Sequence, residues 1–216
     1  MPQSPVIIFD FETTGLTPKQ GDRVIEVAAL RIQNNTVTER FSALMNPDFA
    51  VTPFIEHYTG ISNAMLAKAK PIYQEMNRFY AFIQGANLIA HNASFDKRFL
   101  EAELAELGIA FKGRFACSML LAKRVFPKAP SYKLGELVKY AGIKSEGNYH
   151  RALYDCQMTA QLWFAMEQRL SDDYGLQSLS FDLACKLVKS PKSAVAATIE
   201  NYHTRNPSCQ TLSTED

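Results

Sequence analysis

The sequence has few cysteines, almost no net charge and no long apolar run. Its four cysteines are widely separated, form no CxxC motif and have no spacing suited to a zinc site or a disulfide framework, so we expect free thiols. The 216 residues contain no uncharged stretch long enough to span a bilayer, and the N-terminus has no basic segment followed by an apolar one and a cleavage site. We therefore expect a soluble cytoplasmic protein with no membrane partner.

The charge balance gives no global field that would attract nucleic acid. Lysine and arginine number 23 against 22 aspartates and glutamates, a formal net charge of +1, so any nucleic-acid surface must be a local patch. Basic residues do outnumber acidic ones between residues 112 and 144, a run that is either a phosphate-binding surface or a solvated face. Its members are Lys112, Arg114, Lys123, Arg124, Lys128, Lys133, Lys139 and Lys144, against Glu136.

The hydrophobic pattern predicts an α/β fold with a mixed five-stranded sheet flanked by helices. Strands are expected over 6–9 and its polar continuation, 24–32, 37–45, 87–91 and 115–117, with Asn34-Asn35 as a tight turn. Helices are expected over 53–58, 62–67, 72–83, 94–107, 119–125, 134–141 and 152–170. The pattern changes after residue 170, which predicts a domain over 1–170 and a partly helical appendage with a frayed end over 171–216.

Two carboxylates follow the first apolar strand. Because side chains alternate between the faces of a strand, Asp10 and Glu12 point to one side and Phe9 and Phe11 to the other. Like charges held together at the end of a buried strand repel each other unless a cation lies between them. If the strand instead emerges at the surface, both acids are simply solvated. The first reading predicts a metal site.

Two further places put acids or a histidine where elements meet. Asp96 falls in the first turn of a helix, with Asn92 or Ser94 as its cap, where the helix dipole alone also favours an acid. His150 and Asp155 are five residues apart, about 140° around a helix, so His150 must lie in the loop before the helix for both to reach one site. All three places lie where an α/β fold gathers its site.

Taken together, these residues resemble a known family. Asp10-x-Glu12-Thr13-Thr14-Gly15, His91-Asn92-x-x-x-Asp96 and His150-x-x-x-x-Asp155 are similar to the three motifs of the DEDDh 3′-to-5′ exonucleases, which include exonuclease X and the proofreading epsilon subunit of bacterial DNA polymerase III. The resemblance covers roughly residues 6–170. It implies an RNase H-like fold and an enzyme that releases nucleoside 5′-monophosphates from the 3′ end of a nucleic acid.

The resemblance also implies roles for the site residues. Asp10, Glu12, Asp96 and Asp155 would hold two divalent ions, Mg²⁺ or Mn²⁺, and His150 would be the general base. Substrate contacts are implied for a further set: Thr13, Thr14, Gly15, Leu16, His57 and Asn92. For His57, simple packing is an equal alternative.

Two functional questions stay open on the sequence. DNA is the favoured substrate, but an exoribonuclease of the ribonuclease T or oligoribonuclease kind fits the same motifs, and so does a nucleic-acid-binding or recruiting module that has lost its chemistry. A replication or repair partner could bind residues 171–216, where Gln177-Ser178-Leu179-Ser180-Phe181 loosely resembles the clamp-binding peptide of the epsilon subunit.

Overall fold

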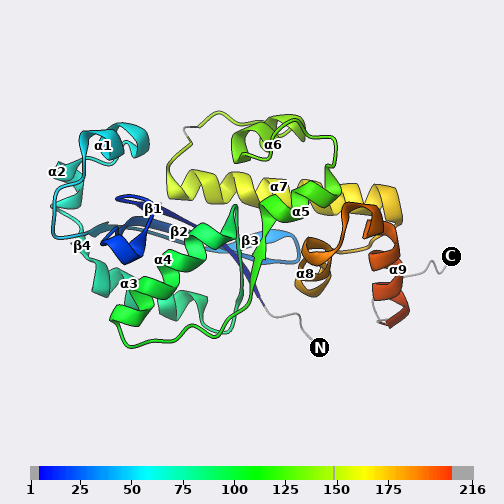
Figure 1. Cartoon of the computed structure of the whole chain (residues 1–216), viewed down its shortest axis with the longest axis horizontal. Helices are drawn as coiled ribbons and strands as arrows, with labels where there is room; N and C mark the ends of the chain where they lie inside the picture. Colours follow the sequence, from blue (N-terminus) through cyan, green and yellow to red (C-terminus); the bar gives the residue numbers. More distant parts are fainter. Residues whose placement is uncertain (1–4, 148, 206–216) are drawn as a thin grey trace.

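A computed structural model describes residues 5–147 and 149–205 of the chain. Its centre is a mixed sheet with strand order β4-β3-β2-β1-β5-β6 (Figure 1). The strands are β1 (Val6–Thr13), β2 (Val24–Gln33), β3 (Thr36–Asn46), β4 (Lys70–Pro71), β5 (Asn87–Ala90) and β6 (Phe115–Cys117). β1, β2 and β3 are antiparallel neighbours, whereas β5 pairs in parallel with both β1 and β6, and β4 pairs in parallel with β3. The α/β fold class is confirmed.

Within the described residues the sheet has six strands, where five were predicted. The additional strand, β4, is the dipeptide Lys70-Pro71, which pairs with the end of β3. Two residues are too few to show an alternating pattern, so nothing in the sequence marks them as a strand. The predicted turn between β2 and β3 is confirmed, because Asn34 and Asn35 both have positive φ angles, 48° and 56°, as a tight hairpin requires.

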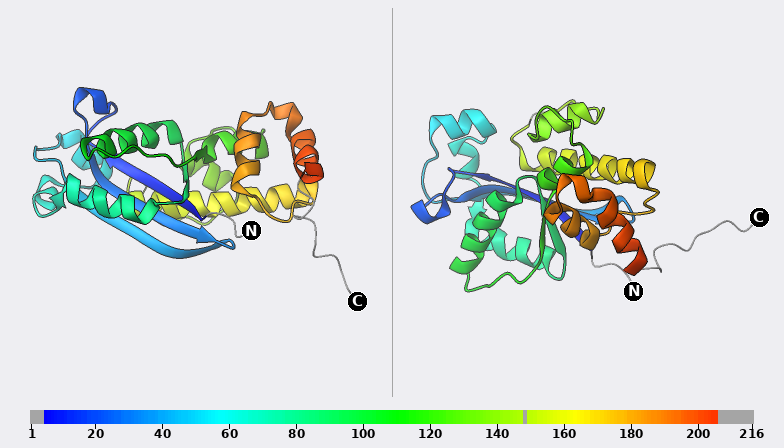
Figure 2. Two further views of the ribbon diagram at one scale, coloured as in Figure 1. Left: turned by 90° about the horizontal axis from the view of Figure 1, so that it is seen from below. Right: turned by 45° about the vertical axis from the view of Figure 1, so that its right-hand side comes forward.

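Helices cover both faces of the sheet (Figures 1 and 2). They are α1 (Pro53–Thr59), α2 (Asn63–Leu66), α3 (Ile72–Ile83), α4 (Ala93–Glu106), α5 (Ser118–Val125), α6 (Leu134–Tyr140), α7 (Ala152–Tyr174), α8 (Phe181–Lys189) and α9 (Val195–Arg205), with single 3-10 turns at Pro18–Gln20 and Lys192–Ala194. α3 and α4 pack on one face of the sheet in one buried cluster, and α5, α7 and α8 pack on the other.

The alternation of β1 divides the core into two layers. Ile7, Phe9 and Phe11 are buried with α3 and α4, whereas Ile8 is buried with α7 and α8. A strand covered on both faces reads as a continuous apolar run, which is what residues 6–9 show. The even-numbered positions of β1 therefore face α7.

The last predicted helix is longer than expected. α7 does not end at Leu170 but continues to Tyr174, and Gly175 ends it in a left-handed conformation with φ 65°. The predicted boundary at residue 170 thus falls inside a helix. Asp172 and Asp173, just after the predicted boundary, are both exposed on the last turn of the helix, where solvent tolerates charge.

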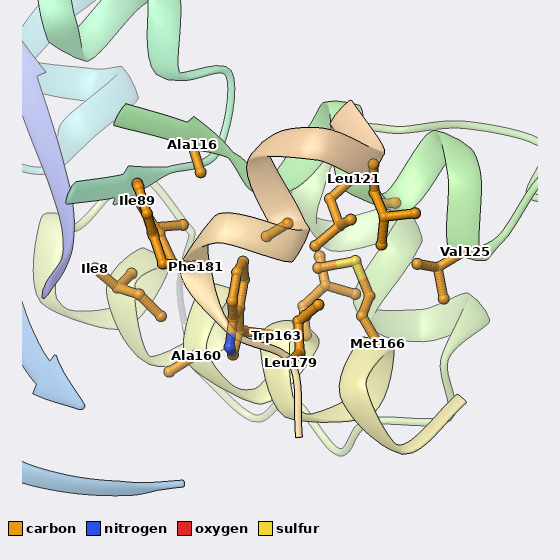
Figure 3. Close-up of a cluster of buried hydrophobic side chains, with 14 of the residues drawn as sticks. Ile8, Ile89, Ala116, Leu121, Val125, Ala160, Trp163, Met166, Leu179 and Phe181 are labelled. Carbon is orange, nitrogen blue, oxygen red and sulfur yellow. The ribbon is translucent and has the colours of Figure 1, made fainter. Parts of the chain in front are cut away.

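The segment after α7 takes part in the core. α8 buries Leu183, Ala184 and Leu187 completely, in the same cluster as Trp163 of α7. Leu179 and Phe181 are also buried there, as Figure 3 shows. The apolar residues of the predicted clamp-binding peptide are therefore part of the core, which argues against that interpretation.

Two remaining expectations concern cysteines and membranes. Cys117, Cys156 and Cys185 are free thiols, as predicted, and Cys209 lies outside the described residues, as does the predicted frayed end at 206–216. Within the described part of the chain, no helix combines the length and apolar character that crossing a bilayer requires.

Candidate active site

Asp10 and Glu12 lie in β1, within the strand rather than after it. They alternate with Phe9 and Phe11, whose rings pack on the α3 and α4 side, so both carboxylates face α7 as the alternation predicted. Asp155, in the first turn of α7, is near enough to act electrostatically on both acids. The sheet and the start of α7 thus bring acidic side chains together from distant parts of the chain, since Asp10 and Asp155 are 145 positions apart in the sequence.

Asp96 completes this group from the first turn of α4. Its Oδ1 accepts a hydrogen bond from the backbone N–H of Phe11 at 3.2 Å, which ties the helix to β1. The predicted side-chain cap is wrong: Asn92 occupies the N-cap position but makes no capping hydrogen bond, and Ser94 is already inside α4. Asn92 instead has a left-handed backbone, with φ 67°, which an asparagine tolerates better than most residues.

His150 lies in the loop before α7, as the helical geometry required. Its φ is 68°, an uncommon conformation for a residue other than glycine, and its backbone N–H donates to Asp155 Oδ2 at 2.9 Å. Its ring lies 3.9 Å from that of Tyr58, centroid to centroid. The loop is therefore folded back onto the helix, and it presents the imidazole to the cleft.

A cleft of about 1310 Å³ contains these residues. Its lining includes every predicted site residue except His57: Asp10, Glu12, Thr13, Thr14, Gly15, Leu16, Asn92, Asp96, His150 and Asp155. His57 is exposed on α1 and lies outside the lining, so its position does not favour the predicted substrate contact. The three sequence motifs converge on one cleft.

The cleft contains a group of side chains that suits a cation. Ligand atoms of Glu12, His150 and Asp155 all lie within 4.8 Å of one another. Asp155 Oδ1 is buried and, among the described residues, has no hydrogen-bond partner, which is costly for a carboxylate unless something else binds it. Carboxylate oxygens are the ligands that Mg²⁺ and Mn²⁺ prefer. The donor set therefore fits the expected ions, with Asp10 and Asp96 adjacent to this trio.

Burial raises the pKa values of all four acids, and the charges of neighbouring acids raise those of Asp10, Glu12 and Asp155 further. Burial, with the charges of Asp155 and Glu26, raises the pKa of Glu12 to about 8. Burial raises the pKa of Asp96 to about 7 against the Phe11 hydrogen bond, and that of Asp155 to about 6 against the bond from His150. The pKa of Asp10 lies well above its usual value because of burial and then Asp96. Ionisation of these acids is therefore disfavoured unless a cation binds between them.

Burial acts in the opposite direction on His150. It lowers the pKa of the imidazole below its usual value of about 6.5, because burial disfavours the charged form. The ring is therefore neutral at pH 7. A neutral imidazole can accept a proton from a nearby water, which is the requirement for a general base.

The loop after β1 is held by Asp22. Asp22 Oδ2 accepts a hydrogen bond from the Thr17 backbone N–H at 2.8 Å, and the Thr14 hydroxyl lies 3.4 Å from Oδ1. A Cβ on Gly15 would overlap the Asp22 carboxylate, so a larger residue here would have to displace that carboxylate or the loop. The loop presents Leu16, which is 74% exposed, at the edge of the cleft.

Sequence reasoning missed the residues that support the site. Glu26 lies opposite Glu12 across β1 and β2 and is 3% exposed. It accepts hydrogen bonds from the Arg151 guanidinium and from the Ala152 backbone N–H, so it anchors the start of α7. The sequence does contain a signal for this role: Glu26 is a single acid inside the apolar run 24–32, and a buried acid needs a partner.

His91 belongs to the second motif, and the resemblance implies no role for it. Its Nε2 donates to the Tyr132 carbonyl at 2.9 Å, and its Nδ1 lies 3.0 Å from the Ser118 hydroxyl. Since a carbonyl can only accept, the neutral ring carries its proton on Nε2, and Nδ1 accepts from Ser118. His91 thus fixes the segment before Lys133 at the edge of the cleft.

The basic run over residues 112–144 contributes little to the cleft. Of its eight basic residues, Lys133 lines the cleft and the other seven do not. The Arg124 guanidinium donates to the carbonyls of Ser190 and Leu120, and Arg114 pairs with Asp182 at 2.6 Å. These two arginines hold the C-terminal helices to the core, so their positions favour a structural role for this part of the run.

Comparison with known sequences supports the motifs. The sequence profile of a family described as "Exonuclease" (RNase_T) matches residues 7–163. The chain is 32% identical over 174 residues to a DNA polymerase III PolC-type of Caldanaerobacter subterraneus subsp. tengcongensis, covering 81% of this chain and 12% of that protein. It is 35% identical over 168 residues to the 3′-5′ exonuclease DinG of Bacillus subtilis, covering 76% and 18%. The chain thus spans under a fifth of the length of these relatives.

Solved structures of exonucleases share the fold of this chain. Exonuclease X in complex with 5′ overhanging duplex DNA aligns with a TM-score of 0.65 and 26% identity, covering 85% of this chain and 99% of that chain. The nuclease domain of 3′hExo, a DEDDh family member, shares the fold with a TM-score of 0.66 and 19% identity, covering 79% and 94%. Because the family profile covers well over half of the sequence, the chain belongs to the exonuclease family.

Proposed function

We propose that the protein hydrolyses phosphodiester bonds at the 3′ end of DNA, depends on two divalent ions and releases nucleoside 5′-monophosphates. The observation that carries the proposal is the buried, unpartnered Asp155 Oδ1 beside Glu12 and His150 in a cleft that holds two further acids. Carboxylates this close together repel one another once they are ionised, and cations between them would relieve that repulsion.

The residues divide the work between binding and proton transfer. Asp10, Glu12, Asp96 and Asp155 hold the ions. When bound, two Mg²⁺ or Mn²⁺ ions supply the charge that stabilises the attacking and leaving oxygens of the phosphodiester. His150, neutral because burial lowers its pKa, takes the proton of the attacking water. Thr13, Thr14, Gly15 and Leu16 hold the terminal nucleotide, and Asn92 contacts it from the start of α4.

DNA is the favoured substrate over RNA because of the kinds of protein to which the chain is similar. These include PolC-type DNA polymerases, DinG and an exonuclease X structure with DNA, although 3′hExo was solved with rAMP. A replication or repair setting follows from the same relatives. Within residues 171–216, the outward faces of α8 and α9 are where a protein partner would bind, since their inner faces belong to the core.

A side-by-side assay tests the proposal. The full chain is incubated with labelled single-stranded DNA, duplex DNA with a mismatched 3′ end, and RNA, each with Mg²⁺, Mn²⁺ or EDTA. We expect stepwise shortening from the 3′ end of DNA with 5′-monophosphates as products, and none in EDTA. Asp10→Ala should abolish it, whereas Asp172→Ala, at an exposed acid of α7, should not. Digestion that survives Asp10→Ala contradicts the mechanism, and faster digestion of RNA contradicts the DNA preference.

A further inference from the structure

Two aromatic side chains on α1 are exposed at the edge of the cleft. Phe54 is 69% exposed and Tyr58 48%, and both line the cleft. The opposite face of α1 is packed: Ile55 is buried with Val51 and Ile61 in a small separate core. One face of α1 is thus packed against the protein, while its aromatic face is exposed to water. Burial of these rings would stabilise the fold, so their exposure does not contribute to stability. Exposed apolar surface of this kind marks a binding site.

The two rings form a row that leads to the acids. The Phe54 and Tyr58 centroids are 5.7 Å apart with their planes 15° from parallel, and the Tyr58 and His150 centroids are 3.9 Å apart. Tyr58 is also close enough to Glu12 and Asp155 for their charges to raise the pKa of its hydroxyl, after burial. Phe54 is therefore the outer end of an aromatic row whose inner end is at the candidate metal site.

The cleft has little positive charge with which to hold phosphates. Among its described lining residues, Lys133 is the single lysine or arginine, against five acids: Asp10, Glu12, Asp96, Glu136 and Asp155. A strand that enters this cleft cannot be held mainly by ion pairs between its backbone and the walls. Stacking of bases on aromatic rings is the alternative means of gripping single strands, and it tolerates any sequence.

We propose that Phe54, backed by Tyr58, is a stacking platform for an unpaired base next to the 3′-terminal nucleotide. The inference rests on the proposed function and specifies its substrate as single-stranded or frayed 3′ ends. A paired base already has both of its faces covered within the duplex, so it gains nothing from the platform. An unpaired base gains about 5- to 100-fold in affinity from one such contact.

Fluorescence and kinetics test the platform in the full chain. The single-stranded DNA carries the fluorescent base 2-aminopurine at the second position from the 3′ end. Quenching of its fluorescence on binding to the protein is measured in a buffer that contains Ca²⁺ in place of Mg²⁺. Hydrolysis of the same strand and of a blunt duplex is then measured in Mg²⁺. Phe54→Ala is compared with Phe54→Tyr, which keeps a ring, and with Tyr73→Ala, which removes a ring that is 55% exposed on α3 outside the cleft.

We expect Phe54→Ala to lose the quenching and to raise KM for single-stranded DNA about 5- to 50-fold, with kcat within about twofold. Its activity on the blunt duplex should change less than twofold. Phe54→Tyr and Tyr73→Ala should match wild type. Unchanged quenching and KM in Phe54→Ala overturn the platform. If the wild-type protein quenches the fluorescence, Phe54→Ala does not, and neither hydrolyses DNA, the stacking platform is supported and the proposed function is wrong.

Discussion

The Glu26 carboxylate accepts two hydrogen bonds from the Arg151 guanidinium, at 2.9 Å from Nη2 and 3.3 Å from Nε. It also accepts the backbone N–H of Ala152, at 2.9 Å. Arg151 is the N-cap residue of α7 and makes no side-chain cap of its own, so a glutamate from β2 caps the helix instead. Since Arg151 follows His150 directly, the loop that carries His150 is fastened to the sheet at this point.

Glu26→Ala should therefore weaken both stability and catalysis. It leaves the Ala152 N–H without its partner and frees Arg151, a loss of about 1–3 kcal/mol in the free energy of unfolding. We expect kcat to fall at least tenfold because the His150 loop is no longer fixed, and Glu26→Gln to recover part of both. Denaturant unfolding and single-strand hydrolysis measure the two effects.

Glu101→Ala is the matched control, because Glu101 and its partner Lys97 are both on the surface, 50% and 46% exposed. An exposed pair of this kind contributes about 0–1 kcal/mol. If Glu26→Ala behaves like Glu101→Ala in both assays, the anchoring role of Glu26 is wrong.

The raised pKa values predict how the metal-free protein responds to pH. Glu12, Asp96 and Asp155, with pKa values of about 8, 7 and 6, keep protons in the folded state that the unfolded chain releases near pH 4. The folded state therefore binds more protons between these values, and stability falls as pH rises from about 4 to about 8. Mg²⁺ should reverse this loss.

Thermal melting at pH 5 to 9, in EDTA and in Mg²⁺, measures the effect. In EDTA the Tm should fall across this range more steeply for wild type than for Asp10→Asn, which removes one of the repelling charges. With Mg²⁺ the Tm of wild type should rise most at high pH. Equal Tm values in EDTA at pH 5 and pH 8 would show that the acids are not held together as described.

Gly15→Ala should disturb the loop that borders the cleft. The new methyl group overlaps the Asp22 carboxylate, which must give up its bond to the Thr17 N–H or push the loop away. Because Leu16 moves with the loop, we expect KM to rise about tenfold, with a small loss of stability. Lys19→Ala, in the same loop but exposed, should match wild type in steady-state kinetics. A wild-type KM for Gly15→Ala contradicts the role of this contact.

Local patterns predicted the parts of the site that depend on strand and helix periodicity. The shared face of Asp10 and Glu12 follows from alternation along β1, and the loop position of His150 follows from its spacing to Asp155. The partners of buried charges depend on contacts between distant segments. Glu26 and Arg151 are 125 residues apart, and no local pattern pairs them.

The C-terminal segment shows the same limit. Leu179 and Phe181 look like an exposed peptide motif in sequence because polar residues surround them. Their burial comes from packing on α7, and Glu167 Oε1 accepts the Leu179 N–H at 2.8 Å. Arg114 then covers the Phe181 ring at 5.1 Å. A polar neighbourhood in sequence therefore did not indicate exposure.

The position of Lys133 predicts how binding depends on salt. It is the basic residue of the 112–144 run that lines the cleft. Lys123 is not among the lining residues, although its ammonium group lies over the ring of Tyr132, which is. One phosphate contact contributes about 0.7 to the slope of log K against log salt for a single strand. Lys133→Gln should reduce the slope by about this amount, and Lys123→Gln should leave it unchanged. Titrations of a labelled single strand over a range of salt concentrations, with Ca²⁺ in place of Mg²⁺, measure the slopes; a change confined to Lys123→Gln would support the rest of the basic run as the phosphate-binding surface.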